Sequence, residues 1–112
     1  RHTKSNKRRS VPINTLARAA LVSRRAVSRS GWVFDGIQDV KRSFGVACQR
    51  CHLVNFRFHD LRHTFASWLV QSGVPLTEVR DLLGHSSIEM TERYAHLAPE
   101  RLRGAVARLE RA

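Results

Sequence analysis

The 112-residue sequence lacks the features that mark several common classes of protein. No apolar run approaches the roughly 18 residues that a membrane span needs, so we expect no transmembrane helix. The basic start is followed by polar residues instead of an apolar segment, so we expect no secretory signal peptide. Two cysteines are too few for a disulfide framework, and a reducing cytoplasm is the simplest compartment for such a chain.

Acidic residues are missing from the first 30 positions, although the same positions hold nine lysines and arginines. Positions 31–112 hold eleven basic and nine acidic residues, so nine of the net +11 charges lie at one end of the chain. Such a stretch repels itself unless an anion neutralises it. The charge therefore favours a polyanionic partner, either nucleic acid or an anionic membrane surface, and a solvated basic face is the alternative.

Turn residues and apolar periodicity predict one mainly α-helical domain with a small β-hairpin at its start. The hairpin is predicted over residues 1–13, with a polar turn at 5–7. The helical part covers 14–112, with helices over 15–27, 38–50, 60–72, 78–83, 87–95 and 100–109. Caps are expected at Asn14, Thr77 and Ser86 or Ser87, and a short extended run is expected at 32–34.

The helix predicted over 60–72 has the clearest apolar periodicity, and Gly73 is expected to end it. Its apolar residues recur at the spacing of a core-facing helix: Leu61, Phe65, Trp68 and Leu69. This pattern predicts that His59, Arg62 and His63 lie on the other side of the helix.

His59 and Arg62 lie three residues apart at the start of this helix, where free N–H groups and the helix dipole favour an anion. The arginine fork adds bidentate recognition of phosphate, so a phosphate clamp is one interpretation. The other is a surface ion pair of Arg62 with Asp60 or Glu78. His59 and His63 also have the spacing of two zinc ligands, but the fixed charge of Arg62 would repel a divalent ion.

Two later segments add to this cluster. LGHSS at 83–87 follows a short predicted helix, and Tyr94, the only tyrosine, comes nine residues after His85. A tyrosine that stands alone on a helix is usually a core residue. Together, however, HDLRHTFAS at 59–67, LLGHS at 82–86 and TERYAH at 91–96 resemble the catalytic domain of the tyrosine recombinase (phage integrase) family in order and spacing. TKSNKRRSVPI at 3–13 is similar to the lysine-bearing hairpin of that family.

The resemblance implies an enzyme that cuts and rejoins DNA through a covalent 3′-phosphotyrosine, without a metal or other cofactor. Tyr94 is then the nucleophile, and Arg62 holds the non-bridging oxygens of the scissile phosphate. His85 donates a hydrogen bond to one of those oxygens. His59 helps to place the phosphate or takes the proton that leaves Tyr94.

The resemblance also assigns roles to the basic start of the chain. Lys4 is the general acid that protonates the departing 5′-oxygen, with Lys7 as the alternative. Further basic or polar residues are expected to contact the DNA: Lys7, Arg8, Arg9 and His63.

By the same resemblance, residues 1–112 form the C-terminal portion of one catalytic domain. The upstream helices, the family's first catalytic arginine and its N-terminal DNA-binding domain have no counterpart here, so the fragment is expected to be inactive and to expose apolar surface. The expected partner is double-stranded DNA, bound by a homotetramer of the full-length protein in a bacterial or phage-derived cytoplasm, with no membrane. The alternative function is a non-catalytic basic DNA-binding module.

Two further patterns have more than one interpretation. Cys48, Cys51 and His52 fit a haem-attachment pattern or three ligands of a zinc site, and coincidence is the simpler interpretation of both. The last predicted helix has Leu102, Val106 and Leu109 on one side, for packing on its own domain or on a neighbouring subunit.

Overall fold

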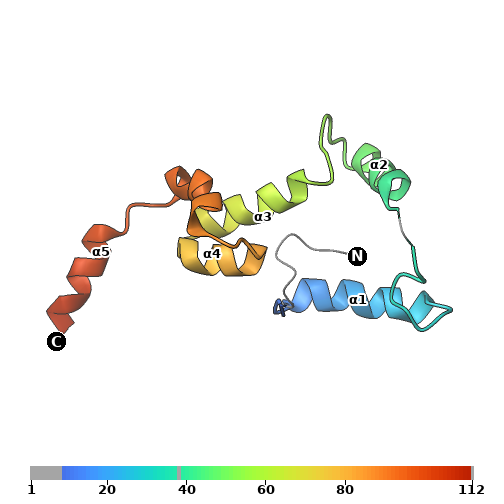
Figure 1. Cartoon of the computed structure of the whole chain (residues 1–112), viewed down its shortest axis with the longest axis horizontal. Helices are drawn as coiled ribbons and strands as arrows, with labels where there is room; N and C mark the ends of the chain where they lie inside the picture. The colour runs from blue at the N-terminus through green and yellow to red at the C-terminus, as the bar shows by residue number, and fades with distance from the viewer. Residues whose placement is uncertain (1–8, 38, 112) are drawn as a thin grey trace. The chain divides into compact units, whose positions relative to one another are not determined.

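The computed structural model describes residues 9–37 and 39–111. The described chain forms two compact units, which we call the N-terminal unit (Arg9–Phe58) and the C-terminal unit (from His59 onward). Every regular element in these ranges is helical (Figure 1). None of the described helices is long and apolar enough to cross a membrane.

The N-terminal unit begins with helix α1 (Thr15–Val27). The Asn14 side chain accepts a hydrogen bond from the Ala17 N–H at 2.9 Å, which satisfies a free donor of the first turn and confirms the predicted cap. Helix α1 ends at Ser28, and no residue of the helix is buried.

A tight loop follows α1 and is organised by Asp35. Its carboxylate accepts hydrogen bonds from the Ser30 hydroxyl, the Ser28 hydroxyl and the backbone N–H groups of Arg29 and Ser30. These bonds, led by the one from the Ser30 side chain, hold the pKa of Asp35 well below its ordinary value. The extended run predicted at 32–34 is wrong, because the residues form turns that fold back around this carboxylate.

Helix α2 (Lys41–Arg50) completes the N-terminal unit and starts three residues later than predicted. Its Phe44 ring lies 6.1 Å from the Phe56 ring and 5.3 Å from the Phe58 ring, centroid to centroid. Cys48 is the buried residue of this helix. A small aromatic cluster therefore joins α2 to the segment that follows it.

In the C-terminal unit, helix α3 (Asp60–Gln71) packs against α4 (Leu76–Leu83) and the short 3₁₀ helix η2 (Glu92–Leu97). A second 3₁₀ helix, η1 (Ile88–Met90), contacts α4 and η2. Gly73, at φ 94°, makes the left-handed turn that ends α3, as predicted. The structure corrects two boundaries here. Helix α4 begins after Pro75, before the predicted Thr77 cap, and the single helix predicted over 87–95 is replaced by η1 and η2.

The core of this unit is formed by side chains from α3, α4 and η2: Ala66, Val70, Val79, Leu83 and Tyr94. The predicted core-facing stripe of α3 is wrong for three of its four members, because Leu61 and Phe65 are almost half exposed and Trp68 is 70% exposed. Only Leu69 packs against the core. The face of α3 that packs inward instead begins at its N-terminus and continues through Ala66 and Val70.

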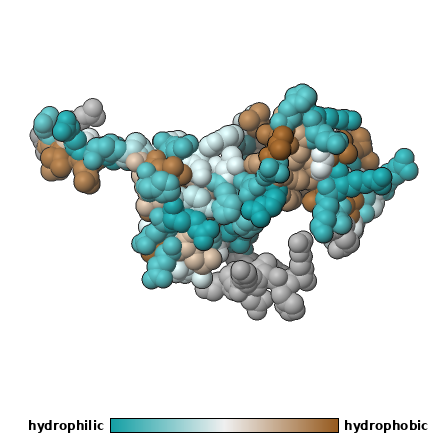
Figure 2. Space-filling model, turned by 90° about the horizontal axis from the view of Figure 1, so that it is seen from above, coloured by the Kyte–Doolittle hydropathy of each residue, from teal (hydrophilic) through white to brown (hydrophobic). Residues whose placement is uncertain are grey.

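Helix α5 (Leu102–Ala107) and the 3₁₀ helix η3 (Arg108–Arg111) end the chain and replace the longer helix predicted over 100–109. Leu102, Val106 and Leu109 are all strongly exposed. Figure 2 shows hydrophobic side chains gathered on this terminal segment, at the left of the view.

The predicted β-hairpin finds no support in the described residues. Residues 9–14 have no regular structure, and the described ranges contain no strand. Residues 1–8, the larger part of the predicted hairpin, lie outside the described ranges. Pro12 also lacks the N–H that a strand pair would use.

Candidate active site

The start of helix α3 carries the first three site residues. His59 occupies the N-cap position, and the backbone N–H groups of Arg62 and His63 donate to its carbonyl at 3.1 and 3.4 Å. Positions 59, 62, 63, 66 and 70 share one helical face, since they recur at intervals of three and four. The buried Ala66 and Val70 therefore place Arg62 and His63 on the face that packs toward α4 and η2.

Arg62 joins this face to the end of α4. Its Nη2 donates a hydrogen bond to the Leu83 carbonyl oxygen. That oxygen is one of the last carbonyls of α4, which ends in the left-handed turn of Gly84 at φ 76°. A guanidinium has several N–H donors, so this contact fixes Arg62 beside His85 and leaves capacity to bind an anion.

His85 is the next residue after that turn. Its Nδ1 lies 2.8 Å from the hydroxyl oxygen of Thr91, a side chain that is fully buried. Burial lowers the pKa of His85 from its ordinary value, and the positive charges of Arg62 and Arg93 lower it further. The lowered pKa favours the neutral form of His85, and the contact with Thr91 orients its ring.

Tyr94 lies in η2 and is buried, with 7% of its surface exposed. Its ring packs in the core of the unit, and its hydroxyl oxygen lies 2.6 Å from Nδ1 of His63. His59 follows on the other side, with its ring edge-on to the His63 ring at 4.8 Å between centroids. The three rings thus form a continuous series from the helix start to the phenol.

The structure therefore brings together four of the five residues predicted to be catalytic, Arg62, His85, Tyr94 and His59, within one compact unit. Lys4, Lys7 and Arg8 lie outside the described residues. Arg9 is exposed and belongs to the N-terminal unit. The roles of these basic residues as general acid and as DNA contacts stay predictions.

Two features of the site did not follow from the sequence. The sequence analysis expected His63 to contact DNA but did not predict its contact with the Tyr94 hydroxyl. Thr91 belongs to the TERYAH motif, but no role was predicted for it beside His85. The available signal was the helical spacing itself, which places His63 one turn after His59 and one turn before the buried Ala66.

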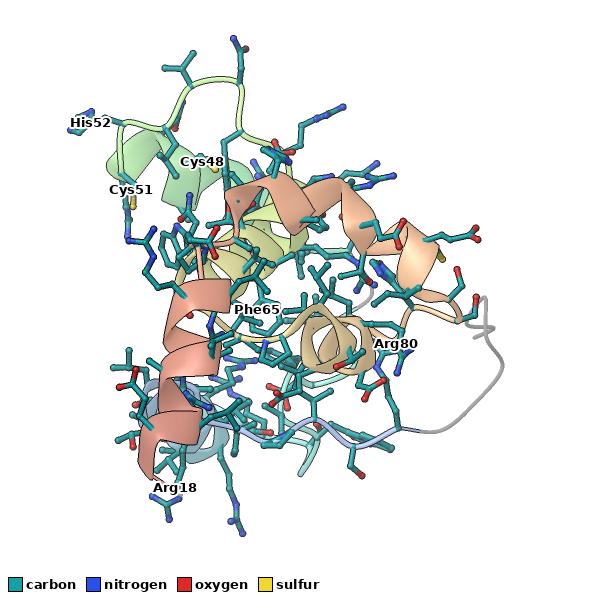
Figure 3. The ribbon with its side chains drawn as sticks, turned by 90° about the vertical axis from the view of Figure 1, so that its left-hand side faces the viewer. Arg18, Cys48, Cys51, His52, Phe65 and Arg80 are labelled. Atoms are coloured by element: carbon teal, nitrogen blue, oxygen red, sulfur yellow. The ribbon has the colours of Figure 1, made fainter. Side chains whose placement is uncertain are left out.

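The sequence analysis considered two possible sets of metal ligands, one at His59 and His63 and one at Cys48, Cys51 and His52. Within the described residues, no group of three or more His, Cys, Asp and Glu side chains lies together as a metal site would require. Cys48 and Cys51 are both free thiols, the first buried and the second exposed, and Figure 3 shows them with His52 at the end of α2.

Comparison with known proteins places this geometry in context. The profile of the Phage integrase family matches residues 1–101. The integrase of Haemophilus phage HP1 (strain HP1c1) is 40% identical over 108 residues, which cover 94% of this chain and 30% of that protein. The tyrosine recombinase XerC of Azotobacter vinelandii is 40% identical over 111 residues, which cover 86% of this chain and 36% of that protein.

A solved structure of a related protein has a similar fold. The catalytic domain of bacteriophage HP1 integrase superposes with a TM-score of 0.70 at 36% identity, covering 94% of this chain and 60% of that chain. This chain thus spans about a third of the length of the two curated relatives. The profile match over most of the sequence, supported by these relatives and this fold, shows that the chain belongs to the phage integrase family.

Proposed function

We propose that this chain supplies the tyrosine, arginine and histidine side chains of a site that cuts and rejoins DNA in site-specific recombination. One observation supports this proposal above others. A cation, a neutral imidazole and a phenol from three separate elements gather in one unit, at Arg62, His85 and Tyr94. Because a phosphodiester carries negative charge and needs a nucleophile, this set of groups suits phosphoryl transfer.

The proposed reaction is a transesterification. The Tyr94 hydroxyl oxygen attacks the scissile phosphorus, a new phosphorus–oxygen bond forms, and the bond to the 5′-oxygen breaks. The phenol loses its proton and the departing 5′-oxygen gains one, from Lys4 or Lys7 as the family resemblance implies. The DNA 3′-end is then held as a phosphotyrosine, so the energy of the broken bond is conserved and rejoining needs no cofactor.

Arg62 and His85 would stabilise the charge that develops on the non-bridging oxygens. The contact with Leu83 holds Arg62 before substrate arrives, which is the preorganisation that makes such donors effective. His85 acts as a neutral donor, because burial and its cationic neighbours oppose its protonation. When the Thr91 hydroxyl donates to Nδ1, the proton of the ring lies on Nε2 and points away from Thr91.

The proposed partner is double-stranded DNA, contacted by the basic residues that the sequence concentrates before position 31. A homotetramer on DNA is proposed for the full-length protein, in line with the family. We also keep the prediction that the 112 residues alone are inactive, since the resemblance assigns a further phosphate-binding arginine to a part of the family that this sequence does not match.

A pool of nicked duplexes with randomised sequence around the nick tests the proposal. The short strand beyond the nick diffuses away after cleavage, so the covalent complex accumulates. The full-length protein that carries this chain should become attached to DNA 3′-ends through Tyr94, and Tyr94→Phe should abolish the adduct while DNA binding persists. If neither protein forms an adduct but both bind DNA, the chain is the alternative, a non-catalytic binding module.

A further inference from the structure

We propose that His63, not His59, is the catalytic base that receives the proton of Tyr94, an inference that rests on the proposed function. Its starting point is the 2.6 Å separation between His63 Nδ1 and the Tyr94 hydroxyl oxygen. This distance is at the short end for a hydrogen bond between a hydroxyl and a ring nitrogen. The contact joins α3 and η2 through two residues that are 31 positions apart in sequence.

The surroundings hold this contact in place. The Tyr94 ring packs in the core beside Ala66 and Val70, so the phenol cannot turn away without disturbing buried side chains. His63 belongs to the same helix as those two core residues. The edge-on ring of His59 lies against His63, which restricts its imidazole from the side of the helix start.

Proton transfer along this hydrogen bond balances the reaction. In the tautomer with the proton on Nε2, Nδ1 carries a lone pair and accepts the hydrogen bond from Tyr94. As the phenol oxygen forms its bond to phosphorus, its proton moves to Nδ1 and His63 becomes an imidazolium. On rejoining, the 5′-hydroxyl attacks phosphorus and returns its proton to the lysine that supplied it. The phenol leaves, and its proton returns from Nδ1 to the phenol oxygen.

His59 is less suited to this role in the described structure. It is exposed and lies against the His63 ring, so one imidazole separates it from the phenol. Its place at the start of α3 fits contact with the phosphate, which is the other role that the resemblance gives it.

The first experiment measures the contact without DNA. Tyr94 is the only tyrosine among these 112 residues, so the 112-residue chain labelled with ¹³C at the tyrosine Cζ gives one resonance that reports the hydrogen bond of this phenol. His63→Phe should shift the resonance, and His59→Phe should shift it much less. An unchanged resonance in His63→Phe would overturn the proposal, and thermal unfolding of each variant checks that the fold is kept.

The second experiment separates holding the tyrosine from taking its proton. His63→Gln keeps a side-chain hydrogen-bonding group but cannot accept a proton at neutral pH. We expect adduct formation on the nicked-duplex pool to slow about 10²-fold or more, the range for loss of a general base, with DNA affinity unchanged. His59→Gln is the matched control and should weaken DNA affinity more than it slows the step.

Rescue completes the test. His63→Ala should regain adduct formation when free imidazole is added, in proportion to its concentration, whereas His59→Ala should not. A wild-type rate in His63→Gln would overturn the role of His63 alone. A wild-type protein that forms no adduct would overturn the proposed function itself and the role of His63 with it, while the NMR result on the hydrogen bond would still stand.

Discussion

Helices α1 and α3 are nearly equal in length, with 13 and 12 residues, but they are built for different environments. Helix α1 has no buried residue and no acidic residue, and it carries Arg18, Arg24 and Arg25. Helix α3 buries Ala66 and Val70 completely or nearly so. One helix presents charge to its surroundings, and the other provides a packed face that carries candidate site residues.

The comparison shows why the site lies where it does. Reacting groups must be held within small tolerances, and packed side chains supply that rigidity. On α3 the residues that would do chemistry continue the same face as the buried Ala66 and Val70. Charge on α1 needs no such precision, because attraction to a polyanion acts over about 10 Å at moderate salt.

The largest predicted effect concerns Arg62. Arg62→Ala should slow covalent capture of DNA about 10²- to 10³-fold, because a preorganised donor to the phosphate is lost. Arg62→Lys should recover only part of the rate, since lysine lacks the planar fork. Arg80→Ala is the control, because this α4 arginine pairs with Asp81 at the surface, 3.1 Å away. Equal losses for Arg62→Ala and Arg80→Ala would show that net charge, and not a site, is responsible.

A second prediction compares the packing of the two helices directly. Val70→Ala removes two methyl groups from a side chain that is 1% exposed, and it should lower the free energy of unfolding by about 2 kcal/mol. Val22→Ala makes the same change on α1, where the valine is 53% exposed, and should change it by less than about 0.5 kcal/mol. Chemical denaturation measures both, and equal losses would contradict the contrast between the two helices.

The sequence was sufficient to predict most helices and the family. The Asn14 cap, the Gly73 stop, and the ends of α1 near Val27 and of α4 at Leu83 follow from local chemistry, and the structure confirms them. The predictions that failed needed tertiary information. Helix α4 begins earlier than predicted because Pro75, whose backbone is fixed by its ring, directly precedes it. Residues 32–34 form turns instead of an extended run because the hydrogen bonds to Asp35 outweigh their extended tendency.

The face of α3 is the most instructive failure. Leu61, Phe65 and Trp68 form the more hydrophobic stripe, so periodicity alone selects them as the core. The structure packs the side with the smaller Ala66 and Val70, because that side lets α4 and the Tyr94 ring approach. Periodicity predicts that an amphipathic face exists, but the neighbouring elements determine which face is covered within this unit.

The third prediction tests the charge of α1. DNA affinity should fall steeply as salt is raised. Replacing Arg18 and Arg25 by glutamine should reduce the slope of log affinity against log salt concentration by up to about one for each arginine that contacts a phosphate. Arg103→Gln and Arg108→Gln, in the C-terminal segment, serve as matched charge controls. If both pairs change the slope equally, the basic N-terminal stretch is not the preferred contact surface.

The smallest predicted effect is a difference between the two units in how their stability depends on pH. The pKa of His85 is lowered on folding, so the folded protein binds fewer protons there than the unfolded chain does. Stability contributed by His85 is therefore complete at neutral pH and is lost as pH falls below 6.5, the ordinary value. The pKa of Asp35 is also lowered, so its contribution is lost only as pH falls below 3.8.

The two tryptophans make these windows separately visible, because Trp32 lies in the N-terminal unit and Trp68 in the C-terminal unit. In Trp32→Phe protein, the unfolding midpoint reported by Trp68 fluorescence should begin to fall below pH 6.5, and His85→Gln should remove that first decline. In Trp68→Phe protein, the Trp32 signal should change mainly below pH 3.8, and Asp35→Asn should remove that dependence. Coincident transitions at every pH would mean that the two units unfold as one, since each probe would then report the same event.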